Sequence, residues 1–502
     1  MPQKGVRQLS IAKKTIASAS ALIAGQLVQR LLGVISMITL ARLLTPDDFG
    51  IVSVATIAVF FLETLTSLGG RQYVAKVERI SDSLVNTAWT LSVITRVICW
   101  IILFSGAELI ANFLDKPETA TAIKVLSTIL LISCFGNPGM MILARQLNYK
   151  PNLTISIVSK TISFIFVVVT AYFTQSYWAM IYGTLISYAI PSVMSHFYTQ
   201  HKPKFSLDNV RAQWHFSKWV LARALLGFSN SQVDSIIVSK FYSLDTIGIY
   251  GMFKNLAMMP ATIFIKPATQ PLLSSFSRIR DESGILPYHI NASVLLLNSI
   301  VIPLVIMMML FHNDIVLMIL GESWRAYAAV FACLAPMLIT HSIVVLLSEL
   351  VIAKHKIHNL FYFDFFSVCI CTSGLLLFSD SGIIDFAIIR TIISFITTVL
   401  FLFFFTKRDI GIGLSTLKFF SIPLLAALFP SYVFYEGYFF WKGNSPVMNL
   451  FINCSFYSTL YSIALISFAL LIKNTAEIKM VASVFLPIVS KAIGLLNIKQ
   501  KQ

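Results

Sequence analysis

The sequence predicts an all-α integral membrane protein with about 14 transmembrane helices, and three observations support this prediction. Of the 502 residues, 57% are hydrophobic and only 12% are charged. A soluble domain carries about 25% charged residues, so this composition suits a lipid environment. The mean hydropathy is +0.80. Apolar stretches of roughly 18 residues, the length of a helix that crosses a bilayer, recur along the whole chain.

The apolar stretches follow one another with short connections. They begin near Ile16, Gly50, Leu84, Ala122, Leu153, Tyr177, Trp214, Thr246, His289, Ala326, Asn359, Ile383, Leu417 and Val447. No connection is much longer than residues 201–213, which leaves no room for a catalytic domain outside the membrane. No G-x-x-x-x-G-K-[ST] loop is present, which excludes a pump that binds ATP through this motif.

The distribution of basic residues predicts the orientation of the chain. The 38 Lys and Arg residues exceed the 22 acidic residues, and the net charge is +16. With a cytoplasmic N-terminus, 24 basic residues fall in cytoplasmic segments and six in outer segments. Because cytoplasmic loops of membrane proteins are enriched in Lys and Arg, we expect both termini in the cytoplasm and an even number of spans.

The other eight basic residues lie within the spans or at their ends. They are Arg30, Arg96, Lys160, Lys218, Arg223, Lys254, Lys266 and Arg390. The acidic residues in such positions are Glu63, Asp234, Glu349 and Asp364. A cation at the centre of a span costs at least about 2.5 kcal/mol, so these bases should face a partner or an aqueous cavity.

Two turns of the sequence repeat each other at an offset of 198 residues. The runs are Arg42-Leu-Leu-Thr-Pro-Asp-Asp-Phe-Gly50 and Lys240-Phe-Tyr-Ser-Leu-Asp-Thr-Ile-Gly248. The offset covers six spans, which predicts two six-helix bundles related by a pseudo-two-fold axis along the membrane normal, a transporter architecture. Alternatively, the two turns share only helix-starting chemistry. We predict an N-terminal bundle at 1–200, a C-terminal bundle at 201–410, and two appended helices with a cytoplasmic amphipathic tail at 411–502.

Several runs together resemble a known family. They are Ala41-Arg42-Leu-Leu-Thr-Pro-Asp-Asp-Phe-Gly50, Phe216-Ser-Lys-Trp-Val-Leu-Ala-Arg223, Asn230-Ser-Gln-Val-Asp234-Ser-Ile-Ile-Val-Ser-Lys240 and Leu320-Gly-Glu-Ser-Trp324. Over roughly its first 350 residues the chain resembles the polysaccharide transporters of bacterial inner membranes. These are the Wzx-type flippases, including the colanic-acid-exporter-like branch, of the multidrug, oligosaccharidyl-lipid and polysaccharide exporter superfamily.

The resemblance implies a function. A member of this family moves an undecaprenyl-diphosphate-linked oligosaccharide from the cytoplasmic to the periplasmic leaflet by alternating access, for O-antigen, capsule or exopolysaccharide synthesis. It is not an enzyme, and we expect no cofactor and no nucleic acid partner. Its expected partners are membrane lipids and, beyond the substrate, the polysaccharide polymerase and chain-length machinery. The substrate is a large anion, which agrees with the embedded bases.

Polar stripes on the first and seventh spans are the candidate substrate site. The first stripe is Gln26, Gln29, Arg30 and Gly33, and the second is Arg223, Gly227, Asn230 and Asp234. Each set recurs at helical spacing, so both stripes can face one cavity. We predict that Arg30, Arg96 and Arg223 bind the diphosphate and anionic sugars, since a guanidinium binds phosphate bidentately and stays charged when desolvated.

Three further residues complete the predicted set. Lys254 lies on the eighth span, which Pro260 and Pro267 should kink or break, and it is a candidate substrate contact. Glu63 is the candidate site for H⁺ or Na⁺ if transport is coupled to an ion gradient. Asp234 could contact substrate, but a structural pairing, for example with Lys240, is the stronger interpretation. No spacing of histidine or of the six cysteines predicts a metal site.

Two alternatives stay open at this point. A membrane glycosyltransferase or polymerase that uses the same lipid carrier would need acids in an outer loop, and Asp47-Asp48 is such a pair. The repeat keeps only Asp245, however, and acids after a Thr suit a helix N-terminus. A multidrug and toxin antiporter of the same superfamily would favour embedded acids rather than bases.

Overall fold

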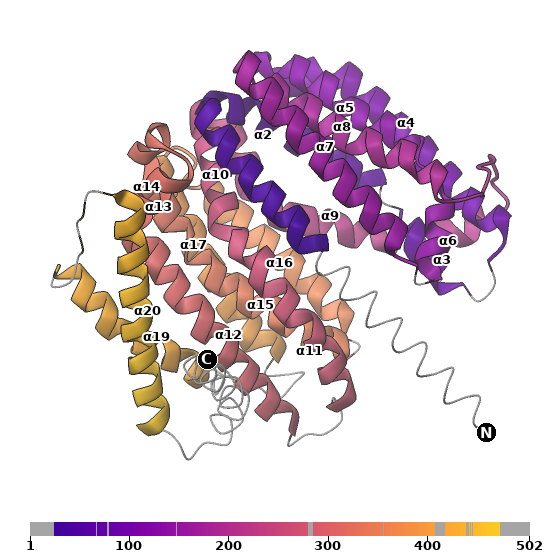
Figure 1. Ribbon diagram of the computed structural model, residues 1–502. Coiled ribbons are helices and arrows are strands. Elements are labelled where there is room, and N and C mark those ends of the chain that lie inside the picture. The colour runs from indigo at the N-terminus through magenta and orange to yellow at the C-terminus, as the bar shows by residue number, and fades with distance from the viewer. Residues whose placement is uncertain are drawn as a thin grey trace, which may run out of the picture. The chain divides into compact units, whose positions relative to one another are not determined.

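Figure 1 shows the computed structural model, which describes residues 25–66, 68–77, 80–146, 148–279, 285–354, 356–406, 417–437, 441, 443 and 445–471. Every regular element in these ranges is a helix, as the sequence predicts. The helices separate into two compact units, Met1–Met252 and Phe253–Gln502. The basic N-terminal stretch and the predicted amphipathic tail lie outside the described residues.

The unit Met1–Met252 begins with the helix Gly25–Leu43, called the first helix below. Its other elements are α2 (Pro46–Thr66), α3 (Gly70–Lys76), α4 (Asp82–Phe113), η1 (Pro117–Thr119), α5 (Ala120–Cys134), α6 (Gly139–Arg145), α7 (Lys150–Thr174), α8 (Trp178–Met194), η2 (Ser195–Phe197), α9 (Val210–Phe241) and the first turns of α10 (Leu244–Pro260).

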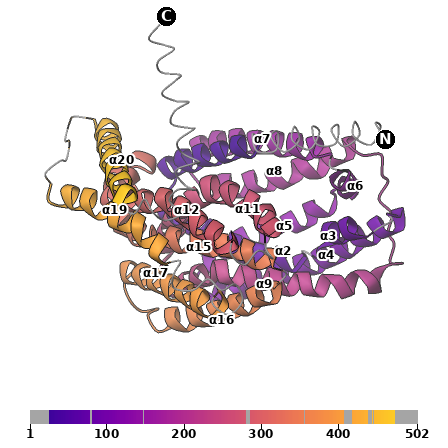
Figure 2. The same cartoon turned by 90° about the horizontal axis from the view of Figure 1, so that it is seen from below.

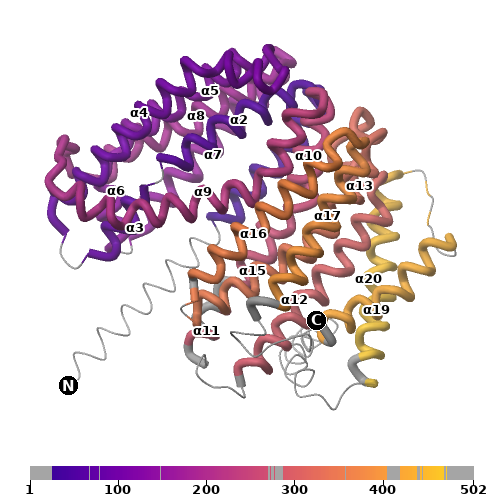
Figure 3. Tube along the Cα trace, turned by 180° about the vertical axis from the view of Figure 1, so that it is seen from behind, coloured from indigo at the N-terminus to yellow at the C-terminus, as the bar shows by residue number. Residues whose placement is uncertain are grey.

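The unit Phe253–Gln502 holds the rest of α10 and the following elements. They are η3 (Ala261–Ile265), α11 (Lys266–Ile279), α12 (Ile285–Leu310), α13 (His312–Ile319), η4 (Glu322–Tyr327), α14 (Ala328–Leu334), α15 (Met337–Ala353), α16 (Ile357–Leu376), α17 (Ile383–Leu400), η5 (Phe401–Thr406), α19 (Leu417–Tyr435) and α20 (Pro446–Leu471). Figure 3 shows α15 beside α11, α12 and α16, against which it packs.

Ten helical segments of the described chain are long and apolar enough to cross a membrane. They include the first helix, α4 and α7 in one unit, and α12, α17 and α20 in the other. The chain is therefore a multi-pass membrane protein. Among the remaining predicted spans, α8 has 17 residues and α9 carries many polar residues. The total of 14 spans stays a prediction.

Small residues let the helices of the unit Met1–Met252 pack closely. In Figure 2, α7 and α8 run side by side. The hydroxyl of Ser163 donates to the carbonyl of Gly183 at 2.7 Å, and that of Ser159 to Ser187 at 2.9 Å. Such interhelical bonds satisfy polar groups that would otherwise be buried unpaired in an apolar medium.

Helix α9 packs on α2, α3 and α4. The Ser217 hydroxyl donates to the carbonyl of Leu68 at 2.5 Å, and the rings of Phe61 and Phe228 lie 5.6 Å apart. The internal repeat assigns this helix to the second half of the chain, whereas its contacts place it in the unit Met1–Met252. The division at 1–200, 201–410 and 411–502 stays a prediction.

The predicted interruption of the eighth span is confirmed. Helix α10 ends at Pro260, a π-helical turn follows at Ala261–Ile265, and α11 begins at Lys266. Proline removes a backbone donor and clashes with the preceding turn, and Pro260 and Pro267 lie on either side of this π-helical turn. Lys254 and Lys266 thus lie on opposite sides of the interruption.

The motif Leu320-Gly-Glu-Ser-Trp324 has a backbone reason for its glycine. Gly321 has φ 104° and ψ 179°, a region that is essentially restricted to glycine. This turn buries the Trp324 ring completely, in edge contact with Phe253 at 6.3 Å. A side chain at position 321 would strain the turn that positions Trp324.

The first of the two repeated turns is a helix cap. Thr45 donates through its hydroxyl to Asp48 Oδ2 at 2.7 Å, and the same carboxylate accepts from the Thr45 N–H at 3.0 Å. In the second turn the Ser243 hydroxyl donates to Asp245. Asp48 Oδ1 also accepts from the Tyr177 N–H at 3.1 Å, which ties the start of α2 to the start of α8. These acids cap helices, as Ser, Thr and Asp do at N-termini.

Candidate functional site

The predicted polar stripe of the first helix lies next to α7. A Cβ built on Gly25 would lie 1.9 Å from Leu153 Cδ1, and one built on Gly33 would lie 3.9 Å from Lys160 Cε. Residues at i, i+4 and i+8 share a helix face, so Gln29 lies on the same face between these two contacts. The stripe and Lys160 therefore belong to one two-helix patch.

Lys160 lies at mid-membrane depth. It is ten residues after the start of α7, or about 15 Å along the helix axis. Its side chain is exposed, and none of the ion pairs found in the described part of the chain includes it. A cation at this depth is stable only beside water or an anion. Lys160 is the site residue that sequence reasoning did not assign, because periodicity within one helix does not reveal its neighbour.

The remaining residues of the first stripe differ in exposure. Gln26 is exposed, while Gln29 and Arg30 are half-buried. The structure therefore brings Arg30 and Lys160 onto adjacent helices, with Gly33 leaving room for the lysine chain. The two bases can act on one anionic group.

Arg96 lies inside the bundle that α2, α4, α5 and α8 form. Its Nη1 donates to the carbonyl of Ser133 at 3.0 Å. The Tyr188 hydroxyl donates to Glu63 at 3.1 Å, and the Arg96 charge acts on both groups. The buried Nε of Arg96 lacks a hydrogen-bond partner among the described residues. The contacts that the structure gives Arg96 are thus with its own bundle, whereas we expected it to contact substrate.

The stripe on α9 is open at one end and buried at the other. Arg223 and Gly227 are exposed, and a Cβ built on Gly227 would meet no atom within 4 Å. Asn230 is half-buried. Arg223 lies 13 residues after the start of α9, or about 20 Å along its axis. A guanidinium in this position can reach a solute beside the helix.

Asp234 is completely buried and bonded within the unit. Its Oδ2 accepts from the Tyr250 hydroxyl at 2.8 Å, and Oδ1 accepts from the Ser235 N–H at 2.8 Å. Lys240, the pairing partner that the sequence suggested, instead forms an ion pair with Asp115 at 2.6 Å. The carboxylate therefore joins α9 to α10 through Tyr250.

Lys240 makes three contacts around the turn between α4 and η1. Beyond its ion pair with Asp115, its Nζ donates to the carbonyl of Phe113 at 2.5 Å and lies 5.0 Å from the Phe113 ring centroid. This hydrogen bond and charge hold the pKa of Asp115 below its usual range. The repeat counterpart Arg42 is exposed.

Lys254 belongs to the unit Phe253–Gln502 and is half-buried on α10. Among the described residues, no group of three or more His, Cys, Asp or Glu side chains could hold a metal ion. Lys254 is the predicted substrate contact from this unit, and it lies about two turns before the π-helical turn.

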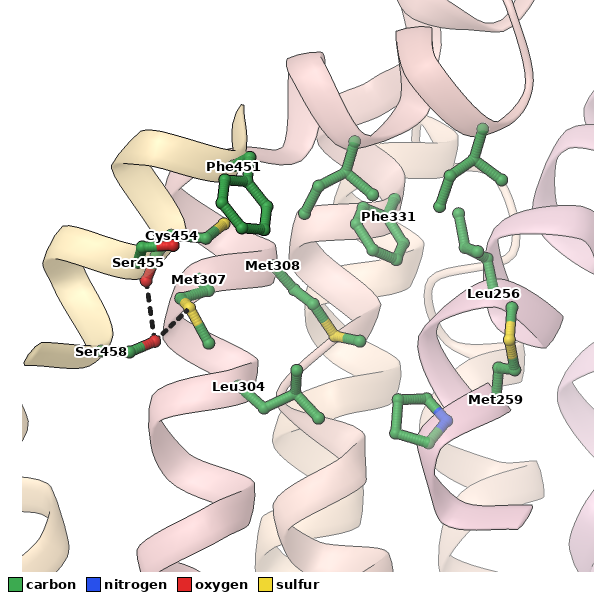
Figure 4. Close-up of a pocket in the computed structure, with 13 residues that line it drawn as sticks. Leu256, Met259, Leu304, Met307, Met308, Phe331, Phe451, Cys454, Ser455 and Ser458 are labelled. Carbon is green, nitrogen blue, oxygen red and sulfur yellow. Dashed lines mark hydrogen bonds between the residues drawn. The ribbon is translucent and has the colours of Figure 1, made fainter. Parts of the chain in front are cut away.

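A separate apolar cavity lies in the unit Phe253–Gln502 (Figure 4). It has a volume of about 490 Å³ and lies between α10, α12, α13, α14 and α20. Met259, Met307, Met308 and Phe331 line it together with other apolar side chains. The Ser458 hydroxyl on its edge donates to the Cys454 carbonyl at 2.7 Å. With no charged group in its lining, this cavity cannot bind a diphosphate.

Comparisons with known proteins give the chain a family. Residues 39–329 match the family described as polysaccharide biosynthesis protein. The chain is 22% identical over 408 residues to the lipopolysaccharide biosynthesis protein WzxC of Escherichia coli (strain K12), covering 80% of this chain and 83% of WzxC. It is 21% identical to the succinoglycan biosynthesis transport protein ExoT of Rhizobium meliloti (strain 1021), covering 58% and 59% of the two chains.

Solved structures show the same fold. The lipid II flippase MurJ in an inward closed conformation matches with a TM-score of 0.72 and 15% identity, covering 88% of this chain and 98% of that one. An inward-facing multidrug resistance MATE family transporter of the MOP superfamily matches with a TM-score of 0.58 and 12% identity, covering 74% and 92%. Identities this low establish the fold alone, which is the predicted all-α membrane fold.

The named relatives agree with the predicted class of protein. Among the sequence relatives, ExoT is named as a transport protein. The family match covers more than half of the 502 residues. The chain belongs to the polysaccharide biosynthesis protein family, in agreement with the family resemblance that its sequence shows.

Proposed function

We propose that the protein is a flippase that moves an undecaprenyl-diphosphate-linked oligosaccharide from the cytoplasmic to the periplasmic leaflet by alternating access. The observation that carries the proposal is the two-helix patch at mid-membrane depth, where Lys160 of α7 lies beside the stripe that contains Arg30. A lipid-linked diphosphate is an anion that must cross this depth, and bases placed there lower its cost of leaving water.

The proposed substrate contacts are Gln26, Gln29, Arg30, Arg223, Asn230 and Lys254, with Lys160 added. Charge-assisted hydrogen bonds to phosphate contribute about 1.5–3 kcal/mol each, and arginine can form two in parallel. Amide side chains such as Gln29 and Asn230 can bind sugar hydroxyls. Arg96 also stays in the proposed set of substrate contacts, although its hydrogen bond to the Ser133 carbonyl lies within its own bundle.

For ion coupling we propose Glu63 as the site that takes up a proton. Its carboxylate accepts a hydrogen bond from the Tyr188 hydroxyl at 3.1 Å and interacts electrostatically with Arg96. Protonation of Glu63 would therefore change the balance of charge inside one bundle. Glu63→Gln should abolish the dependence of export on the proton gradient, measured with a protonophore. Gradient-dependent export by this variant would exclude Glu63.

The proposed location is the bacterial inner membrane, with both termini in the cytoplasm. The excess of basic residues in the predicted cytoplasmic segments supports this orientation. The polysaccharide polymerase and the chain-length machinery are the proposed partners, because they act on the repeat unit once it reaches the outer leaflet. A multidrug antiporter is less well supported, since embedded bases outnumber embedded acids.

The test is complementation of a strain that lacks the gene. Arg30→Gln, Lys160→Gln and Arg223→Gln should each lower polysaccharide export at least tenfold, about the loss of one charge-assisted bond. Lys218→Gln is the matched control, because Lys218 is an exposed base whose Nζ lies 5.7 Å from the Trp219 ring centroid near the start of α9. Full export by all three site variants, at normal protein levels in the membrane, would contradict the proposed site.

A further inference from the structure

The two repeated turns meet each other in a reciprocal contact. A Cβ built on Gly50 would lie 2.0 Å from the Leu244 carbonyl oxygen, and one built on Gly248 would lie 1.9 Å from the Pro46 carbonyl oxygen. Gly50 and Gly248 are repeat equivalents at the 198-residue offset, and so are Pro46 and Leu244. The start of α2 and the start of α10 therefore cross with each glycine against the other helix's carbonyl.

Two more repeat-related pairs lie at the same crossing. A Cβ built on Gly251 would lie 3.2 Å from Ser53 Oγ, and these two residues are also 198 positions apart. The Asp47 carboxylate lies beside the backbone of Asp245, its own repeat equivalent. A residue that contacts its own equivalent lies at the pseudo-two-fold axis, so the axis passes through this crossing.

We propose that this glycine crossing, formed by Pro46, Gly50, Ser53, Leu244, Gly248 and Gly251, is the seal at the predicted outer ends of the spans. Helices α2 and α10 separate at the glycine crossing in each transport cycle. The inference rests on the proposed function, since a seal has to open only if a solute passes.

Backbone contact closes the crossing tightly, and yet little holds it shut. Glycine brings the two main chains together, which leaves no path for a sugar between them. At Gly50, Gly248 and Gly251 the contact is made by backbone atoms and one small side chain, so separation there removes few apolar contacts. Asp47 of α2 and Asp245 of α10 carry like charges at the crossing, and the repulsion between them favours opening. A close but weakly held contact suits a seal rather than a fixed joint.

The experiment joins the two helices by a disulfide. In a chain whose six native cysteines are replaced, Ser53→Cys and Gly251→Cys place two thiols at the axis, within reach of each other. Oxidation should form the disulfide and lower export at least tenfold, and a reductant should restore export. The control pair is Thr340→Cys and Ser394→Cys on α15 and α17, whose hydroxyl oxygens lie 2.5 Å apart within one unit. Oxidation of this pair should leave export unchanged.

Two results would overturn the proposal. Undiminished export with the disulfide formed would show that the glycine crossing is a fixed joint. Absence of the disulfide under oxidation would show that the crossing does not form in the membrane. If the reduced double variant does not export, the single variant Ser53→Cys decides instead, since its labelling by a membrane-impermeant maleimide should require active transport. Failure of the proposed function itself differs from all of these, because the unmodified chain would then not restore export.

Discussion

Alanine in place of Gly248 should shift the transporter away from the state in which α2 and α10 cross. The added Cβ would lie 1.9 Å from the Pro46 carbonyl oxygen, whereas ordinary contact begins at 3.4 Å, so the helix ends must separate by 1.5 Å. Neither atom belongs to a flexible side chain. Overpacking of this kind costs about 1–3 kcal/mol. That free energy corresponds to a change of about 5- to 150-fold in the ratio of closed to open molecules.

The assay is the rate at which Ser53→Cys reacts with a membrane-impermeant maleimide in cells, in a chain whose six native cysteines are replaced. Gly248→Ala should raise the rate several-fold, and Gly50→Ala should do the same, because its Cβ would lie 2.0 Å from the Leu244 carbonyl oxygen. Gly106→Ala is the control, since a Cβ there meets no atom within 4 Å. Equal labelling in the Gly248 and Gly106 variants would refute the reasoning.

Three further substitutions test the fold around the site. Asp115→Asn should lower the melting temperature at neutral pH and make it less dependent on pH. Because Lys240 lowers the pKa of Asp115, the ion pair stabilises the folded protein above the unfolded-state pKa of Asp115, and this stabilisation is lost as the pH falls through the folded-state pKa. Melting curves in detergent from pH 7 to pH 3 measure the effect. Tyr250→Phe removes a donor from the buried Asp234 carboxylate and should cost about 1–3 kcal/mol, measured by denaturant unfolding, with an unchanged midpoint speaking against this bond. Gly321→Ala should cost about 1–3 kcal/mol, because its φ of 104° is strained for any side chain, and an unaltered melting temperature would contradict that geometry.

Patterns within one helix or one turn could be predicted from the sequence. Composition and apolar length predicted the all-α membrane fold, and Pro260 predicted the interruption of the eighth span. The pair of runs at a 198-residue offset predicted an internal repeat, and the contact of Gly50 and Gly248 with each other's helix agrees with it. These features depend on local chemistry, such as the backbone donor that proline lacks.

Relations between helices could not be predicted in the same way. Lys160 was counted among the embedded bases, but only the packing of α7 along the first helix places it beside Gly33. Arg96 has the same type and depth as the other candidates, yet its neighbours are Ser133, Glu63 and Tyr188 of its own bundle. Periodicity fixes the face on which a residue lies, while the identity of the facing helix is set by tertiary packing.

The glycine crossing likewise combines a local feature that the sequence predicts with a contact between helices that it does not. The acids Asp47 and Asp245 suit helix N-termini, and the structure adds that the Asp47 carboxylate lies beside the helix start of its own repeat equivalent. A single sequence can align the two turns but contains no signal that they touch. Contact between them follows only from the fold.

The most direct test of the central claim is the sidedness of the lipid-linked oligosaccharide in a strain that lacks the gene. The flippase account predicts that the diphosphate-linked repeat unit accumulates on the cytoplasmic leaflet, protected from a membrane-impermeant glycosidase or periodate, and that the restored gene clears it. If the repeat unit instead reaches the outer leaflet and remains unpolymerised there, the protein acts at a later step and the account is wrong.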